Sequence, residues 1–187
     1  AVGITNSRTQ AKIEQQQKLA EQQALREVLP EDASIEERSG AGDDALPATY
    51  WAAMRDSVAV AYAFKGDYKG YAAEIKIVAG LDTAGEILGV SILEQKETPG
   101  LGTRVTETVS KRTIWNPLAG SDEESTEPWF TEQFEGLDLD DRITIEKSAE
   151  WHTLSDARRE SLEDKNAISA ITGATISTTA VVKGLET

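Results

Sequence analysis

The chain of 187 residues contains no cysteine and only one histidine, His152. The lack of cysteine excludes disulfides, zinc–thiolate sites, cysteine-bound iron–sulfur clusters and a thiol nucleophile. A single histidine leaves little from which to build a histidine-rich metal site or an ordinary hydrolase triad. These absences direct attention to other polar side chains, above all to hydroxyl groups.

Basic residues and long apolar runs are also scarce. The chain has 19 Lys and Arg against 33 Asp and Glu, which gives a net charge of −14. Nucleic acid and anionic lipid surfaces are therefore disfavoured as partners, because both require a surplus of basic side chains. No apolar stretch approaches the length that a membrane-spanning helix needs. The composition indicates a globular domain with a polar extension.

Residues 1–30 predict a long polar helix. Residues 6–28 are rich in Gln, Glu, Lys and Ala, contain no Gly or Pro, and place Leu25 and Val28 near helical spacing. The helix should end before Pro30, because a residue that precedes proline disfavours the helical conformation. Its first half is almost entirely polar, so we expect either an ordinary surface helix or a stalk that leads away from the domain.

Residues 31–48 are acidic and contain Gly and Pro, which indicates a linker before a domain at residues 49–187. Within this domain, residues 57–64 predict a strand, and two strand-like runs within residues 71–95 flank a favourable hairpin turn at residues 82–85. Further predicted elements are a turn at 65–69, a short helix within 103–115, a strand around Ile143 and Ile145, a helix or connector at 153–169, and a small helix ending near Gly184. This order lacks regular βαβ alternation, which predicts an α+β fold with an antiparallel or mixed sheet and packed helices.

The segment "AITGATISTTAV" at residues 170–181 combines five hydroxyl side chains with one glycine and no charge. Gly173 permits a turn conformation that other residues resist, and Ser177 is a good candidate to cap the helix that follows. Thr175 would stand just ahead of a helix N-terminus, which is a favourable place for a phosphate. From these residues alone, a capped helix with spare hydroxyls remains the more common interpretation.

The segment "KETPGLGTR" at residues 96–104 lies between a predicted strand and a predicted helix. Gly100 and Gly102 would allow the backbone to approach a flat ligand closely. Glu97 and Thr98 would lie at the end of the strand, where they could offer a hydrogen-bond acceptor and a hydroxyl. Taken alone, the segment is more typical of a structural turn from strand to helix.

Together the two segments resemble a known family. "ETPGLG" followed some 70 residues later by "TGATIST" resembles the FMN-binding domain of the RnfG and NqrC subunits of ion-translocating electron-transport complexes. The resemblance covers residues 50–185, and "GYAAEIKIVAGLDTAGEILGVSIL" at residues 70–93 resembles the strand pair that precedes the first motif. RnfG is the more similar of the two, because the chain is short and lacks an obvious insertion.

The resemblance implies that the hydroxyl of Thr175 is joined to FMN through a phosphoester. The residues expected to shape or flank the phosphate turn are Thr172, Gly173, Ala174, Ile176, Ser177 and Thr178. Those expected to contact the flavin ring or its ribityl chain are Glu97, Thr98, Gly100, Leu101 and Gly102. None of these residues is implied to act as a catalytic group.

One position departs from the family pattern, which has Asp three residues before the Ser or Thr of the second motif. This chain has Ser169 there. In the family, a separate Mg-dependent flavin transferase attaches FMN, taking it from FAD, and recognises that Asp. The chain would therefore need no catalytic base of its own, but the serine puts the efficiency of attachment in question.

The resemblance also implies partners and a location. The domain would lie on the extracytoplasmic, periplasmic side of the membrane, anchored by an apolar helix before Ala1. It would act with other membrane subunits and relay electrons between ferredoxin and NAD in a complex that pumps Na⁺ or H⁺. FMN bound covalently at one residue would accept and pass on those electrons.

Three other interpretations remain open at this point. The chain could be an NqrC-like subunit of a Na⁺-translocating quinone reductase. It could be a flavin-binding or sensory module with non-covalent or absent flavin and no redox role, which Ser169 favours. It could also be a structural domain of such a complex that uses its N-terminal helix for assembly.

The four tryptophans could stack on a flavin, but tryptophan more commonly fills a core or a surface groove.

Overall fold

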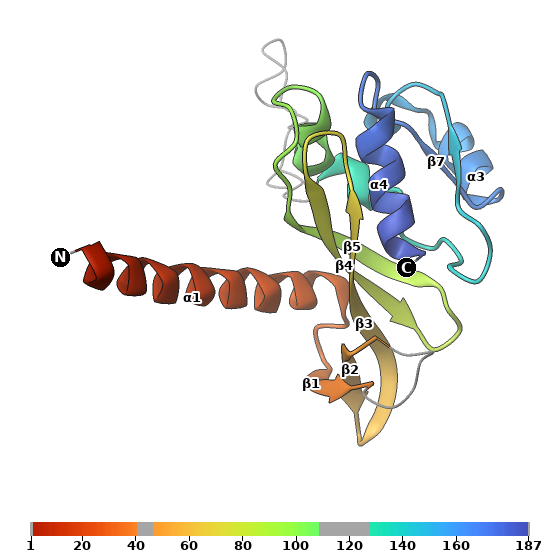
Figure 1. The fold of residues 1–187 in the computed structure, drawn as a ribbon. Coiled ribbons are helices and arrows are strands. Elements are labelled where there is room, and N and C mark those ends of the chain that lie inside the picture. The colour runs from red at the N-terminus through yellow and green to blue at the C-terminus, as the bar shows by residue number, and fades with distance from the viewer. Residues whose placement is uncertain (1, 41–46, 109–127, 187) are drawn as a thin grey trace, which may run out of the picture.

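The structure is a computed structural model that describes residues 2–40, 47–108 and 128–186, without the side chains of residues 2–9 and 11. Its elements are α1 (Val2–Val28), β1 (Ser34–Ser39), β2 (Thr49–Arg55), β3 (Val58–Lys69), β4 (Glu74–Asp82), β5 (Ile87–Glu94), η1 (Gly102–Thr106), α2 (Trp129–Glu132), β6 (Thr144–Glu146), η2 (Trp151–Thr153), α3 (Asp156–Glu163), β7 (Ala167–Ser169) and α4 (Thr175–Leu185). Figure 1 shows α1 extending from one side of a long sheet, with α4 on the other.

The main sheet is an antiparallel meander of five strands in the order β1-β2-β3-β4-β5, and β6 and β7 form a separate parallel pair. Asp56 and Ser57 connect β2 to β3 with positive φ at both residues, the backbone of a tight two-residue hairpin turn. The predicted turn at residues 82–85 does connect β4 to β5. These features confirm the predicted α+β fold.

The two faces of the sheet carry two separate apolar cores. Along β4, Ile75, Ile77 and Ala79 pack in the core beneath α4, whereas Val78 packs with α1. This alternation follows from the strand geometry, because successive side chains point to opposite faces. Phe130 in α2 is fully buried in the α4 core.

Two strand glycines allow the helices to approach the sheet closely. A Cβ atom at Gly66 in β3 would lie 1.8 Å from the carbonyl oxygen of Gly184, near the end of α4. A Cβ atom at Gly80 in β4 would lie 1.9 Å from the carbonyl oxygen of Val28, the last residue of α1. Any other residue type would therefore push a helix terminus off the sheet.

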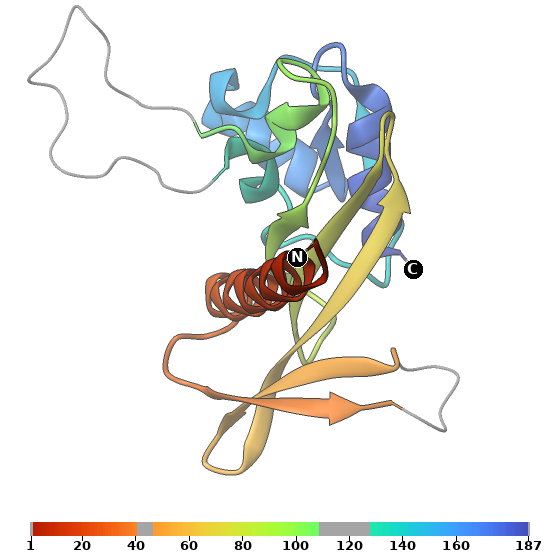
Figure 2. The same ribbon diagram turned by 60° about the vertical axis from the view of Figure 1, so that its left-hand side comes forward.

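The N-terminal helix has two different parts. Its last turn is buried against the sheet through Ala24, Leu25 and Val28. Ile13 and Leu19, earlier in the helix, are exposed. Figure 1 shows the helix extending away from the sheet, and Figure 2 views it nearly along its axis. The helix predicted over residues 6–28 is confirmed. Among the described residues, no helix has the length and apolar character needed to cross a membrane.

Some sequence-based predictions were wrong. The acidic segment 31–48, predicted as a linker, contains β1, which pairs with β2 and forms the edge of the sheet. Residues 65–69, predicted as a turn, continue β3 because they pair with β4. Of the helix predicted within residues 103–115, the structure describes a short 3-10 helix, η1, and residues 109–115 lie outside the described residues.

Candidate functional site

The two sequence motifs meet in space although some 70 residues separate them. The loop at residues 98–102 follows β5 and leads into η1, which packs against α4. A Cβ atom at Gly173 would lie 3.2 Å from Cδ2 of Leu101, so the Leu101 side chain touches the turn that precedes α4. The fold therefore places the "ETPGLG" loop beside the "TGAT" turn.

The turn before α4 is held in shape by Thr178. The N–H of Ile171 donates to the Thr178 hydroxyl at 3.1 Å, and that hydroxyl donates to the carbonyl oxygen of Ala174 at 3.1 Å. The N–H of Ala174 closes the turn on the Ile171 carbonyl at 3.0 Å, and Gly173 has a φ of +79°. Thr178 is fully buried, so its hydroxyl braces the turn from inside.

Thr175 is the first residue of α4, and it is exposed. Ala174 occupies the N-cap position, and no side chain of the described residues caps this helix. Backbone N–H groups in the first turn of an α-helix lack partners within the helix and attract anions. The Thr175 hydroxyl therefore lies at an uncapped helix N-terminus that suits a phosphate.

The prediction that Ser177 caps this helix was wrong. Ser177 lies inside the first turn of α4, is buried, and donates its hydroxyl to Oε2 of Glu97 at 2.5 Å. Ala174 occupies the N-cap position and Ser177 lies inside the helix, so its hydroxyl is free to donate to the charged acceptor Glu97. A Cβ atom at Gly102 would lie 2.6 Å from both partners' side chains, so the first motif needs glycine there.

The Glu97 carboxylate also binds a third segment of the chain. Its Oε1 accepts hydrogen bonds from the N–H of Ala72 at 2.9 Å and of Ala73 at 3.2 Å, and its Oε2 accepts one from the N–H of Tyr71 at 3.1 Å. Glu97 is only 5% exposed. Burial raises the pKa of Glu97, but Ser177 and the three backbone donors outweigh that effect and lower the pKa below its ordinary value.

Arg104 attaches the first motif to the C-terminal half of the domain. It lies in η1 and binds both carboxylate oxygens of Glu150, at 2.5 and 2.8 Å, while its Nε binds Glu107 at 2.8 Å. Its guanidinium also lies 5.6 Å from the ring centre of Trp129. The hydrogen bonds from Arg104 lower the pKa of Glu150, and the pKa of Arg104 is raised in turn. The paired charges fix the position of η1.

The residues predicted for the site separate by exposure. The exposed ones are Thr172, Gly173, Thr175, Ile176, Gly100 and Leu101, and Thr98 is half-buried. The buried ones are Ala174, Ser177, Thr178, Glu97 and Gly102. Glu97 was expected to contact the flavin, but the structure places its carboxylate in an internal network. Sequence reasoning did not assign residues 71–73 to the site, because backbone donors carry no residue-type signal.

Ser169, at the position that departs from the family pattern, is also internal. Its hydroxyl donates to the carbonyl oxygen of Ala149 at 2.6 Å, and its N–H donates to Oε1 of the buried Gln133 at 2.7 Å. The side chain is fully buried at the end of β7. Ser169 therefore holds the strand that leads into the attachment turn and presents no surface group.

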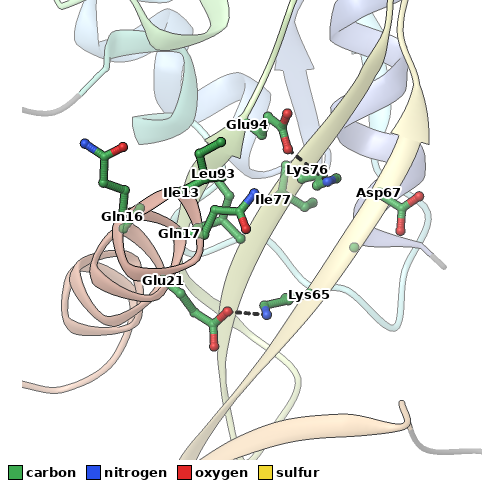
Figure 3. A pocket seen from close by; sticks show the side chains of 12 residues that line it. Ile13, Gln16, Gln17, Glu21, Lys65, Asp67, Lys76, Ile77, Leu93 and Glu94 are labelled. Carbon is green, nitrogen blue, oxygen red and sulfur yellow. Dashed lines mark hydrogen bonds and ion pairs between the residues drawn. The ribbon is translucent and has the colours of Figure 1, made fainter. Parts of the chain in front are cut away.

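Other features of the described residues do not coincide with this site. A pocket of about 510 Å³ between α1 and the sheet contains the pairs Glu21–Lys65 and Glu94–Lys76, and none of the predicted site residues line it (Figure 3). The described residues hold no cluster of three His, Cys, Asp or Glu suited to a metal ion. Trp51, Trp129 and Trp151 are buried, and Trp115 lies outside the described residues.

Comparison with known proteins agrees with the motif resemblance. The family described as the FMN-binding domain matches residues 70–187. The G subunit of the ion-translocating oxidoreductase complex of Shewanella piezotolerans is 31% identical over 196 residues, covering 99% of this chain and 78% of that protein. The G subunit of the Na⁺-translocating ferredoxin:NAD⁺ oxidoreductase complex of Acetobacterium woodii is 27% identical over 198 residues, covering 99% and 80%.

Two solved structures share the fold. NqrC of Shewanella oneidensis superposes with a TM-score of 0.51 at 17% identity, covering 87% of this chain and 66% of that one. The C subunit of the Na⁺-translocating NADH-quinone reductase of Parabacteroides distasonis superposes with a TM-score of 0.56 at 17% identity, covering 96% and 91%. At this identity the likeness concerns the fold alone.

Proposed function

The chain belongs to the FMN-binding domain family, and on that premise we propose that it carries FMN joined by a phosphoester to Thr175 and serves as an electron-transfer subunit of an ion-translocating oxidoreductase complex. Whole-chain similarity to the G subunits of two such complexes supports this membership. It favours a ferredoxin:NAD-type complex over a quinone reductase, because the NqrC likeness is one of fold at 17% identity.

The position of Thr175 is the main support for assigning it as the residue to which FMN is attached. This residue is exposed, whereas the nearby hydroxyls of Ser177 and Thr178 are buried and already hydrogen-bonded. It opens a helix whose N-terminus no described side chain caps. Exposed Leu101, which touches the same turn, offers an apolar contact for the flavin that would follow the phosphate. These features fit a phosphate-linked flavin.

Attachment would form one bond and break one. The Thr175 oxygen forms a bond to the phosphorus of the FMN half of FAD, the phosphoanhydride bond breaks, and AMP leaves while the threonine proton passes to solvent. The helix N-terminus would hold the resulting phosphodiester charge. A separate transferase would supply the catalytic groups, since the chain supplies only the hydroxyl and its surroundings.

When bound, FMN supplies one- or two-electron chemistry, and the protein orients it and tunes its potential. The internal network of Glu97 and Ser177 would keep the two motif loops together around the tether. We further propose an extracytoplasmic, periplasmic location, other membrane subunits as partners, and a role for α1 as the connection to a membrane anchor. The exposure of Ile13 and Leu19 and the course of α1 away from the sheet support that last role.

The intact mass of the protein, matured in a host that has a flavin transferase, tests the attachment. The wild type should carry the mass of one FMN less one water, and Thr175→Ala should lose it. Thr83→Ala is the matched control, because this exposed threonine lies in the turn between β4 and β5, outside both motifs, and its loss should leave the added mass unchanged. Equal masses for the wild type and Thr175→Ala would refute the assignment. A flavin released by denaturing ultrafiltration would favour the non-covalent alternative.

A further inference from the structure

The Glu97 network brings a third chain segment to the attachment site. One carboxylate oxygen, Oε2, accepts hydrogen bonds from both the Tyr71 N–H and the Ser177 hydroxyl. The turn between β3 and β4 is thereby held against the first turn of α4. Both ribbon views show this yellow turn beside the N-terminal end of α4 (Figures 1 and 2).

Each of the three joined segments exposes one large apolar side chain. Tyr71 is 69% exposed on the β3–β4 turn, Leu101 is 45% exposed on the first motif, and Ile176 is 54% exposed on α4. Within the described part of the chain, the Tyr71 ring makes no aromatic or cation–π contact. Exposed apolar side chains on segments that one hydrogen-bond network joins offer a candidate binding surface.

We propose that Tyr71, with Leu101 and Ile176, forms the surface on which one face of the FMN isoalloxazine ring lies. The inference rests on the proposed attachment at Thr175. Ile176 directly follows that residue, so a tethered ring is held at high local concentration beside this surface. The ring is flat, aromatic and largely apolar, which matches an exposed tyrosine ring flanked by aliphatic side chains.

None of the described tryptophans is placed to stack on the flavin ring, which leaves Tyr71 as the aromatic candidate. Trp129 and Trp151 are buried in the α4 core, and Trp51 is buried on the opposite face of the sheet. None of these rings can stack on a flavin tethered at Thr175 without unfolding part of a core. The backbone N–H of Tyr71 is bound to Glu97, and the Tyr71 side chain is exposed.

The test uses the holoprotein with FMN attached, and compares Tyr71→Ala, Tyr71→Phe and the control Tyr62→Ala. Tyr62 is an exposed tyrosine in the middle of β3, away from the motifs. Intact mass is measured first, followed by iodide quenching of flavin fluorescence and by visible circular dichroism. Tyr71→Ala should expose to solvent the face of the flavin ring that Tyr71 covers. The iodide quenching constant of the flavin should then rise about twofold, and its visible circular dichroism should weaken. Tyr71→Phe and Tyr62→Ala should match the wild type.

The outcomes separate this inference from the proposed function. A wild-type protein without added FMN mass refutes the attachment and, with it, this inference. Added mass with the same quenching constant in the wild type and Tyr71→Ala overturns the inference alone. The inference is also overturned if Tyr71→Phe behaves like Tyr71→Ala, because the aromatic ring would then not be the contact. It is overturned likewise if Tyr71→Ala alone loses its FMN.

Discussion

Replacing Glu97 with glutamine probes the internal network that joins three segments of the domain. The amide oxygen can still accept from Ala72 and Ala73, but the amide nitrogen would face the Tyr71 N–H, donor against donor. The change also removes the charge from a side chain that is only 5% exposed and receives four hydrogen bonds. Ser177 can reverse its hydroxyl and accept, so its bond need not be lost.

The magnitude follows from these contacts. A hydrogen bond to a charged group contributes about 1.5–3 kcal/mol and a neutral one about 0.5–1.5 kcal/mol. Glu97→Gln loses the Tyr71 hydrogen bond and the charge that strengthens the three remaining hydrogen bonds, but it also removes the cost of burying a charged carboxylate. The net effect should lower the free energy of unfolding by about 2–3 kcal/mol. Glu94→Gln is the matched control. Glu94 forms partly exposed ion pairs with Lys76 and Lys96, so its replacement should cost about 1 kcal/mol or less.

Urea unfolding at neutral pH measures both variants, and the pH dependence gives a second check. Because the folded-state pKa of Glu97 lies below its ordinary value of 4.5, the carboxylate contributes stability that is fully present above about pH 4.5. That contribution is lost as the pH falls through the lower folded-state pKa. The stability difference between the wild type and Glu97→Gln should therefore shrink in acid. A Glu97→Gln cost no larger than that of Glu94→Gln would refute the reasoning.

Two further predictions concern the packing of the helices on the sheet. Gly66→Ala would place its Cβ 1.8 Å from the Gly184 carbonyl oxygen, so thermal denaturation should show a loss of several kcal/mol or no folded protein. Gly100 has a φ of +74° but open space around it, so Gly100→Ala should cost only about 1–2 kcal/mol; equal costs would contradict the close approach. Leu25→Ala should cost about 2–4 kcal/mol because Leu25 is buried, whereas Leu19→Ala, at an exposed position, should change stability by less than about 0.5 kcal/mol. Similar urea midpoints for the two leucine variants would show that α1 does not pack on the sheet.

Local patterns predicted several elements well. The proline-terminated polar helix, the hairpin at residues 82–85 and the small C-terminal helix each follow from signals within a few residues of one another. β1 carried no such signal. Its sequence SIEERS leaves only Ile35 partly buried, so it lacks the apolar alternation of a half-buried strand. Pairing with β2 makes it a strand, and pairing is a non-local event.

The prediction for residues 65–69 failed for a related reason. Gly66 and Asp67 are typical turn residues, and local propensity predicts a turn there. In the folded chain, β4 supplies backbone partners along this segment, and the missing side chain of Gly66 admits the end of α4. Tertiary contacts therefore outweigh the turn propensity of two residues.

The motifs themselves were legible in the sequence because glycine, proline and hydroxyl residues act through local backbone conformation. They indicated the family, a turn at Gly173 and a helix that begins beside Thr175. Only the tertiary structure decided which side chains are available. It buries Glu97 and Ser177 against each other, leaves Thr175 exposed, and binds the backbone N–H of Tyr71 to Glu97. Burial and partner choice depend on segments far apart in the chain, and every residue type except proline offers the same backbone N–H, so no local pattern could have specified them.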